Sequence, residues 1–153
     1  MEQRINYQKA APKALKGMFE LEKYIANSDL EHSLYELVKL RASQINGCAY
    51  CIDMHTKDAR EAGETEQRLY ALTAWRETPF YSDRERAALE WTEALTLISE
   101  NDVPDSLYES ACEYFDEQEL ITLTMAIVAI NGWNRIAISF RTIPGSYKSE
   151  KKL

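Results

Sequence analysis

Residues 47–55 read Gly47-Cys48-Ala49-Tyr50-Cys51-Ile52-Asp53-Met54-His55, and they place two cysteines and a histidine within eight residues. In a helix that begins at Cys48, each residue turns by about 100°, which sets Cys51 about 60° and His55 about 20° from Cys48 around the axis. The three side chains then share one stripe on the first two turns. Two thiols and an imidazole on one face of a helix start indicate a redox site.

The sequence on both sides of this stretch has the composition and periodicity of α-helices. Its 153 residues include only five glycines and four prolines, and no strand-like alternation or internal repeat is present. Apolar periodicity predicts a first helix that begins between residues 7 and 12, with Pro12 in its opening turn, and ends at about residue 27. Further helices are expected over about residues 30–45, 48–62, 65–78, 82–101, 104–114 and 117–140. We therefore predict an all-α fold of about seven helices, in a single domain that spans residues 1–153.

The last expected helix, residues 117–140, is apolar nearly all round between positions 120 and 130. Such a helix belongs at the centre of a domain or in a subunit interface. Asn131, Asn134 and Arg135 follow at spacings of three and four, so they share one face of the helix. We interpret this polar stripe as part of a subunit interface rather than as the mouth of an active site.

Net charge and cysteine count exclude several classes of protein. A net charge of -7 argues against a nucleic-acid-binding protein, because phosphate recognition needs a basic patch. Three cysteines are an odd number, which makes a poor disulfide framework and favours a reducing compartment. Residues 1–6 lack the apolar core of a signal peptide, and the apolar run at 120–130 is too short to span a bilayer. We expect a cytoplasmic protein with no membrane partner.

A helix start gives the CxxC motif its chemistry. Unpaired N–H groups and the positive end of the helix dipole stabilise a thiolate, the form that attacks a peroxide or a disulfide. His55 can accept the proton of a thiol, and a sulfenic acid on one cysteine can condense with the other to a disulfide. Three other interpretations are open at this point. The first is half of a zinc site, although a fourth ligand is missing. The second is a thioredoxin fold, although that fold needs strands on both sides of the motif. The third is a pair of buried structural thiols beside a surface histidine.

Residues 36–55, ELVKLRASQINGCAYCIDMH, resemble the core motif of the AhpD-like alkylhydroperoxidase family, which shares a superfamily with the carboxymuconolactone decarboxylases. The active-site pattern of that family is a glutamate, eleven residues, CxxC, three residues and a histidine. Four residues fit this pattern without an insertion: Glu36, Cys48, Cys51 and His55. The resemblance implies an all-α, AhpD-like helical bundle that forms an obligate homo-oligomer, a trimer or a hexamer.

The resemblance also implies a role for each of these four residues. Cys51 is the thiol that attacks the peroxide, and Cys48 is the outer, resolving thiol that meets the reductant. Glu36 and His55 form a proton relay to Cys51. We expect Glu36 to be partly buried with a raised pKa, because the neighbouring faces of its helix are apolar. The best-known members carry a second histidine within the CxxC, where this chain has Tyr50, whose hydroxyl is a poor base at neutral pH.

By the same resemblance, the function is that of a thiol-dependent peroxidase that reduces hydroperoxides through a Cys48–Cys51 cycle. The redox pair itself is then the only redox group, and we expect no bound metal or other cofactor. The implied partners are a hydroperoxide and a thiol or dithiol reductant, such as a lipoyl or thioredoxin-like protein. Two alternatives are a redox-sensing or disulfide-reductase partner protein and a lactone decarboxylase. The CxxC argues against the decarboxylase, because that reaction needs no redox pair.

Residues outside the motif receive structural interpretations. Cys112 has apolar neighbours and is interpreted as a buried structural thiol, and His32 as a surface residue. Lys39 and Arg41 can attract an anionic reductant or substrate, but we interpret them as solvated ion pairs. The polar tail, residues 144–153, is expected to fray.

Overall fold

The computed structural model describes residues 1–149, and helices without any strand make up the regular structure of this range. In chain order the helices are α1 (Tyr7–Ala10), η1 (Pro12–Leu15), α2 (Lys16–Ala26), α3 (His32–Asn46), α4 (Ala49–Glu61), α5 (Glu66–Ala71), η2 (Leu72–Glu77), α6 (Asp83–Thr96), α7 (Asp105–Cys112) and α8 (Glu117–Phe140), where η marks a 3-10 helix. The predicted all-α class is confirmed. The described residues hold eight α-helices rather than seven, because the first expected helix is divided.

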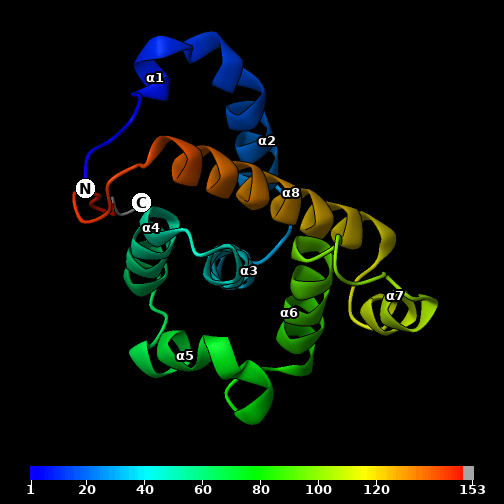
Figure 1. Ribbon diagram of the computed structural model, residues 1–153. Coiled ribbons are helices and arrows are strands. Elements are labelled where there is room, and N and C mark those ends of the chain that lie inside the picture. Colours follow the sequence, from blue (N-terminus) through cyan, green and yellow to red (C-terminus); the bar gives the residue numbers. More distant parts are fainter. Residues whose placement is uncertain (150–153) are drawn as a thin grey trace.

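α3 is the central helix of the fold. Figure 1 shows it end-on between α4, α6 and α8, which are its main contacts. Residues 34–40 of α3 are all buried. Seven consecutive residues span nearly two turns, so neighbours must cover α3 on every side. Two of these buried residues, Glu36 and Lys39, are charged, which puts an ion pair in the middle of the molecule.

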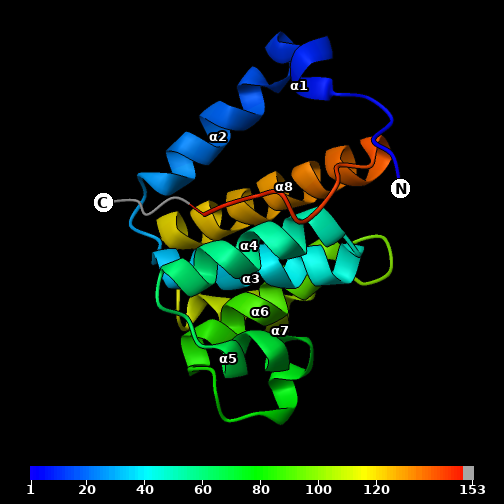
Figure 2. The ribbon, with the colours of Figure 1, turned by 90° about the vertical axis from the view of Figure 1, so that its left-hand side faces the viewer.

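α8 lies between α2 and the other long helices. Figure 2 shows α1 and α2 on one side of α8, with α3, α4 and α6 on the other. Leu123, Ile127 and Ile130 of α8 are fully buried, whereas Ile121 and Val128 are exposed. The centre of the fold is therefore taken by α3, and α8 leaves part of its apolar surface uncovered. The predicted role of α8 in a subunit interface stays a prediction.

Side chains next to the helix starts explain where α6 and α8 begin. Each starts with a capping box, in which the cap side chain and the third residue of the helix exchange hydrogen bonds with each other's backbone. The two pairs are Ser82 with Glu85, and Asp116 with Glu119. Ser82 and Glu85 are three residues apart, which is the spacing of this motif in a sequence. Both α6 and α8 also carry acidic residues in their first turn, where the helix dipole favours negative charge.

Two expected helices are interrupted. The first expected helix, whose start was placed between residues 7 and 12, breaks at Ala11, whose backbone has φ -144° and ψ 63°. Pro12 causes this break, because proline disfavours helical backbone in the residue before it. The helix predicted over 65–78 is kinked at Ala74, with φ -120° and ψ 33°, and continues as η2.

α8 is the one helix within residues 1–149 that is long and apolar enough to cross a membrane by length and composition alone. The prediction that no segment spans a membrane was based on the length of the apolar run at positions 120–130. That argument does not hold for α8, whose 24 residues are long enough. Core helices of soluble proteins satisfy the same criteria, and α8 packs against α2, α3 and α6.

The tail after α8 lies along α4. Three hydrogen bonds attach it: the Gly145 N–H to the Asp53 carboxylate at 3.0 Å, Lys57 Nζ to the Tyr147 carbonyl at 3.0 Å, and the Tyr147 hydroxyl to the Asp58 carboxylate at 2.8 Å. The expectation of a frayed tail is therefore wrong for residues 144–149, because side chains of α4 provide partners that are remote in sequence. Residues 150–153 lie outside the described range.

Candidate functional site: a buried CxxC pair beside a Glu–His–Lys cluster

The junction of α3 and α4 positions the CxxC motif. Gly47 ends α3 with φ 68°, a left-handed conformation that glycine adopts without steric cost. Cys48 follows as the cap residue of α4, and its Sγ accepts a hydrogen bond from the backbone N–H of Cys51 at 3.4 Å. Cys51 and His55 then occupy the first two turns of α4, as predicted.

Cys48 and Cys51 form a disulfide whose Cα atoms are 5.4 Å apart. Only 1% of Cys48 and 2% of Cys51 is exposed, and both pack in a cluster with Ala42, Ile130 and Ala137. α8 thus covers the pair. The resemblance implies an outer position for Cys48, but the two cysteines are equally buried in this oxidised state.

Glu36 and His55 form the second part of the site. Glu36 Oε2 lies 3.2 Å from His55 Nδ1, and both residues are at least 95% buried. Burial lowers the pKa of His55 below its usual value, although the hydrogen bond with Glu36 opposes this. The imidazole is therefore neutral at pH 7. Because the carboxylate can only accept, Nδ1 carries the proton, and Nε2 keeps a lone pair that can accept one.

Lys39 completes this cluster, and its role was missed in the sequence. Its Nζ lies 2.6 Å from Glu36 Oε1 and 3.7 Å from the centre of the Tyr35 ring, and only 7% of Lys39 is exposed. The interpretation of Lys39 as a solvated ion pair is therefore wrong. Arg41 likewise pairs with Glu93 at 2.8 Å in a mostly buried position.

The pKa of Glu36 is lowered, contrary to our expectation. Burial raises the pKa of this carboxyl, but the hydrogen bond from His55 and the Lys39 charge outweigh burial and bring the pKa to about 2. Burial of Glu36 was predicted, but it is nearly complete rather than partial, and the effect of the Lys39 cation one turn away was not predicted. His32 approaches the same carboxylate, with Nε2 3.7 Å from Glu36 Oε1, and its side chain is half exposed as predicted.

A cavity of about 220 Å³ opens beside Cys51 and His55. Aromatic side chains from three helices and from the CxxC itself form much of its wall: Tyr7, Phe19, Tyr50 and Trp133. Met54 and Ala137 add apolar surface, and Gln8 and Glu22 add polar groups to the lining beside His55. A small organic molecule with an apolar part fits such a lining. The contributions of α1 and α2 were missed, because nothing local in the sequence relates them to the CxxC.

A second cavity, of about 310 Å³, is lined by Glu36, Lys39, His32, Asp58 and Tyr147 among others. The hydrogen-bonded pair of Glu36 and His55 thus connects two cavities. Ligand atoms of Glu36, His55 and Asp58 lie within 4.8 Å of one another, a spacing that can hold a metal ion. Lys39 already neutralises the Glu36 carboxylate, and the Tyr147 hydroxyl donates to the Asp58 carboxylate. This donor set therefore fits a cation poorly.

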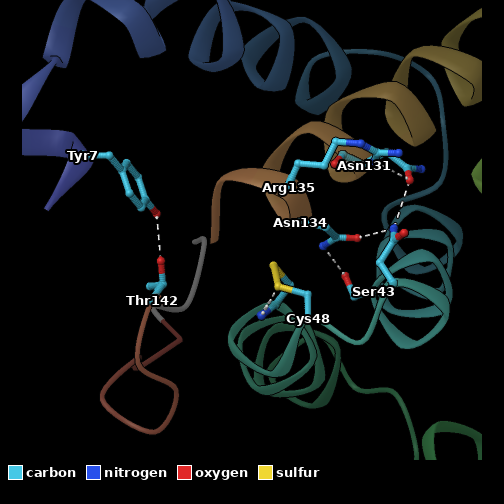
Figure 3. Close-up of a disulfide and its surroundings, with 9 residues drawn as sticks. Tyr7, Ser43, Cys48, Asn131, Asn134, Arg135 and Thr142 are labelled. Atoms are coloured by element: carbon cyan, nitrogen blue, oxygen red, sulfur yellow. Dashed lines mark hydrogen bonds between the residues drawn. A yellow bond between two sulfur atoms is a disulfide. The ribbon is translucent and has the colours of Figure 1, made fainter. Parts of the chain in front are cut away.

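A polar network joins α8 to the end of α3 just before Cys48. Figure 3 shows Asn134 pointing toward Ser43, and its Nδ2 donates to Ser43 Oγ at 3.0 Å. Asn46 Nδ2 donates to the side-chain oxygens of Asn134, at 2.9 Å, and Asn131, at 3.0 Å. Asn134 is fully buried in the chain, so its predicted place in a subunit interface is wrong. The network fixes the end of α3 and hence the position of Cys48.

The family model described as "Carboxymuconolactone decarboxylase family" matches residues 12–94, more than half of the chain. This chain belongs to the carboxymuconolactone decarboxylase family. Within this family it has the AhpD-like fold. The solved structure of ATU0492 from Agrobacterium tumefaciens superimposes with a TM-score of 0.92 at 46% identity, covering 95% of this chain and 100% of that chain. ATU0492 is a protein of unknown function that has been suggested to be an antioxidant defence protein AhpD.

Two further proteins are similar to this chain in sequence. The uncharacterized protein YdfG of Bacillus subtilis (strain 168) is 51% identical over 139 residues, which are 91% of this chain and 95% of YdfG. Alkyl hydroperoxide reductase AhpD of Mycobacteroides abscessus is 49% identical over 49 residues, which are 31% of this chain and 28% of AhpD. The family resemblance stated from the motif is confirmed.

Cys112, the third cysteine, is exposed near the end of α7. The prediction of a buried structural thiol is wrong, because the neighbouring Ala111 and Phe115 point into the core while Cys112 faces solvent. Cys112 is therefore separate from the buried pair in both position and environment.

Proposed function

We propose that this protein is a thiol-dependent peroxidase that reduces organic hydroperoxides with the Cys48–Cys51 pair. One observation carries the proposal: Cys51 and His55 line the same apolar cavity, where burial keeps His55 neutral and its hydrogen bond to Glu36 fixes the orientation of the ring. A thiol next to a neutral imidazole that can take its proton is the arrangement that activates a cysteine nucleophile. The 49% identity to AhpD over 49 residues supports the same chemistry.

The proposed oxidation has two steps. First, the Cys51 thiolate attacks the terminal oxygen of the hydroperoxide, the O–O bond breaks, and the alkoxide takes a proton to leave as an alcohol. His55 supplies that proton after taking the one from the Cys51 thiol. Second, the Cys48 thiolate attacks the Cys51 sulfur of the sulfenic acid, the S–O bond breaks, and the departing hydroxide takes a proton from solvent to leave as water. A thiol reductant then restores the dithiol.

We further propose that the protein is a cytoplasmic homo-oligomer, a trimer or a hexamer. Exposed apolar side chains on α8 (Ile121 and Val128) and α2 (Phe19 and Tyr24) support association. A reducing compartment suits a CxxC that must return to the dithiol.

The test is the oxidation of the fully reduced protein by an organic hydroperoxide, followed by stopped-flow Trp fluorescence and by thiol counting. Wild type and Cys112→Ser should be oxidised at the same rate, whereas Cys51→Ser should lose the fast phase. If Cys51→Ser keeps the fast phase, Cys51 is not the thiol that reacts with the hydroperoxide and the proposed function is wrong. A wild-type rate no greater than that of a free thiol, together with a change of oligomer on oxidation, would favour the redox-sensing alternative.

A further inference from the structure

The two sulfurs of the disulfide have different surroundings. Cys51 is part of the lining of the 220 Å³ cavity, and Cys48 is not. Cys48 is 1% exposed and packs with Ala42, Ile130 and Ala137 beneath α8. A thiol that approaches through the cavity therefore meets Cys51 first.

The helix start favours the same direction of attack. Thiol–disulfide exchange is faster when the departing sulfur is stabilised as a thiolate. Cys48 Sγ occupies the cap position of α4 and already accepts the backbone N–H of Cys51 at 3.4 Å. The positive end of the helix dipole stabilises a negative charge at that position. Cys48 is thus the better leaving group, and Cys51 is the reachable sulfur.

We propose that the reductant enters the aromatic cavity and attacks Cys51, so that the mixed disulfide forms on Cys51 and not on Cys48. The proposal rests on the proposed peroxidase cycle for the origin of the disulfide. It is opposite to the assignment implied by the AhpD resemblance, in which Cys48 meets the reductant.

The exchange balances as follows. The reductant thiolate bonds to Cys51 Sγ, the Cys48–Cys51 bond breaks, and its electron pair stays on Cys48 as a thiolate. A second reductant thiolate attacks the reductant sulfur of the mixed disulfide and releases the Cys51 thiolate. Two thiols are oxidised to one disulfide, and the protein pair gains two electrons and, from the thiols and solvent, two protons.

The cavity also indicates the class of the reductant. Its aromatic wall, formed in part by Tyr7, Phe19 and Trp133, suits an apolar carrier. The Glu22 carboxylate lies in the same lining and already accepts the Trp133 indole N–H at 3.0 Å. A negative charge there disfavours anionic thiol carriers. About 220 Å³ has room for a slender thiol arm but not for the surface of a folded redox protein. The expected reductant is a slender, uncharged thiol or dithiol with an apolar carrier.

The site of the mixed disulfide can be mapped directly. The oxidised protein is mixed with benzyl mercaptan, quenched in acid after milliseconds to seconds, and alkylated at its free thiols under denaturing conditions. The tryptic peptide 42–57 contains both cysteines, and tandem mass spectrometry locates the two labels. We expect the benzylthio group on Cys51 in about tenfold or greater excess. A majority on Cys48, or an equal distribution, overturns the proposal.

Access through the cavity is tested with a matched pair of variants. Gln8 lines the cavity and is exposed, whereas Lys9 is an exposed neighbour that does not line it. Gln8→Trp should slow reduction of the disulfide by benzyl mercaptan about tenfold, because access limits exchange at a buried disulfide. Lys9→Trp should reduce at the wild-type rate. Equal rates in both variants would show that the reductant uses another route.

This experiment is independent of the peroxide reaction, because diamide can form the disulfide without a hydroperoxide. If benzyl mercaptan labels Cys48 while peroxide still oxidises Cys51 rapidly, the inference fails and the proposed function stands. If peroxide oxidation is slow while the label appears on Cys51, the proposed function fails and the direction of reduction stands.

Discussion

Glu36 is a buried carboxylate whose two oxygens are both satisfied by other side chains. Lys39 contacts Oε1 at 2.6 Å, and His55 contacts Oε2 at 3.2 Å. A buried carboxylate is costly without such partners, so the ionised form depends on them. A group with a pKa of about 2 is a weak proton acceptor at neutral pH. Glu36 therefore acts on His55 as a fixed negative charge that holds its tautomer, more than as a carrier of protons.

Glu36→Gln should make stability less sensitive to acid. The folded-state pKa of Glu36 is about 2 against an ordinary value of 4.5, so its contribution of roughly 3 kcal/mol is complete above pH 4.5 and is lost as pH falls toward 2. Urea unfolding at pH 7, 4.5 and 2.5 measures this. The gap between wild type and Glu36→Gln should narrow below pH 4.5, whereas Glu20→Gln, an exposed control on α2, should follow the wild type. Parallel curves for Glu36→Gln would contradict the ion pair.

Lys39→Met should move the acid limb of peroxide oxidation to higher pH. Burial is the main cause of the lowered pKa of His55, and the Lys39 charge lowers it further. Removing that charge raises the pKa of His55 and leaves less neutral imidazole in weakly acidic solution. The rate of oxidation of the reduced protein is measured between pH 5 and 8. Lys23→Met, an exposed lysine on α2, serves as the control. A rate that falls equally at every pH would assign Lys39 a packing role alone.

At the scale of helices, local chemistry was readable from the sequence and distant contacts were not. The bounds of α8 were predicted at residues 117–140, because the Asp116 cap and the acidic first turn lie next to the backbone groups that they stabilise. The kink at Ala74 was missed, because it appears inside a segment whose composition is ordinary for a helix. The break before Pro12 has a local signal, since proline disfavours helical backbone in the preceding residue and Pro12 was one expected start of the first helix.

Gly47→Ala should test the junction of α3 and α4. A side chain at position 47 would meet no atom within 4 Å, so the cost comes only from the backbone at φ 68° and amounts to about 1 kcal/mol. Gly17→Ala is the matched control, since Gly17 also has open space but lies in α2 with an ordinary helical backbone. That change should raise stability by up to about 1 kcal/mol. Destabilisation of both variants alike in urea would argue against the left-handed strain.

The functional site likewise has one part that could be predicted from the sequence and one part that could not. Glu36, Cys48, Cys51 and His55 follow a motif with fixed spacing, and the structure brings all four together at the α3–α4 contact. The cavity wall could not be predicted, because Tyr7 and Trp133 reach it from positions far along the chain. Lys39 follows Glu36 by one helical turn in the sequence, but its burial depends on the helices that surround α3.

At the scale of the whole molecule, the N-terminal segment meets the end of α8 and the residues that directly follow it. The Arg4 N–H donates to the Phe140 carbonyl at 3.0 Å, and the Thr142 hydroxyl lies 3.5 Å from the Tyr7 hydroxyl (Figure 3). Tyr7 belongs to the cavity, so its position depends on segments near both ends. The site is therefore a property of the whole fold and not of α3 and α4 alone.

Ile121→Glu should dissociate the proposed oligomer. Ile121 and Val128 are seven residues apart on α8, so they share a face, and charge on an apolar interface is costly. Sedimentation velocity should show a smaller species for Ile121→Glu than for wild type. Ile98→Glu is the control, because Ile98 and Ile121 are each 61% exposed and Ile98 lies beyond the end of α6. A monomeric wild type would remove the basis for the oligomer, and dissociation by Ile98→Glu would place the interface elsewhere.

The junction between α3 and α4 also limits how this part of the sequence can change in length. Gly47 and the cap residue Cys48 are all that separate the two helices. An inserted residue that extended either helix would turn Cys51 and His55 by about 100° and shift them by about 1.5 Å relative to Glu36. The imidazole would then face away from its carboxylate. Insertions and deletions should therefore be excluded between Glu36 and His55, while the loops at residues 62–65 and 97–104 are free to vary.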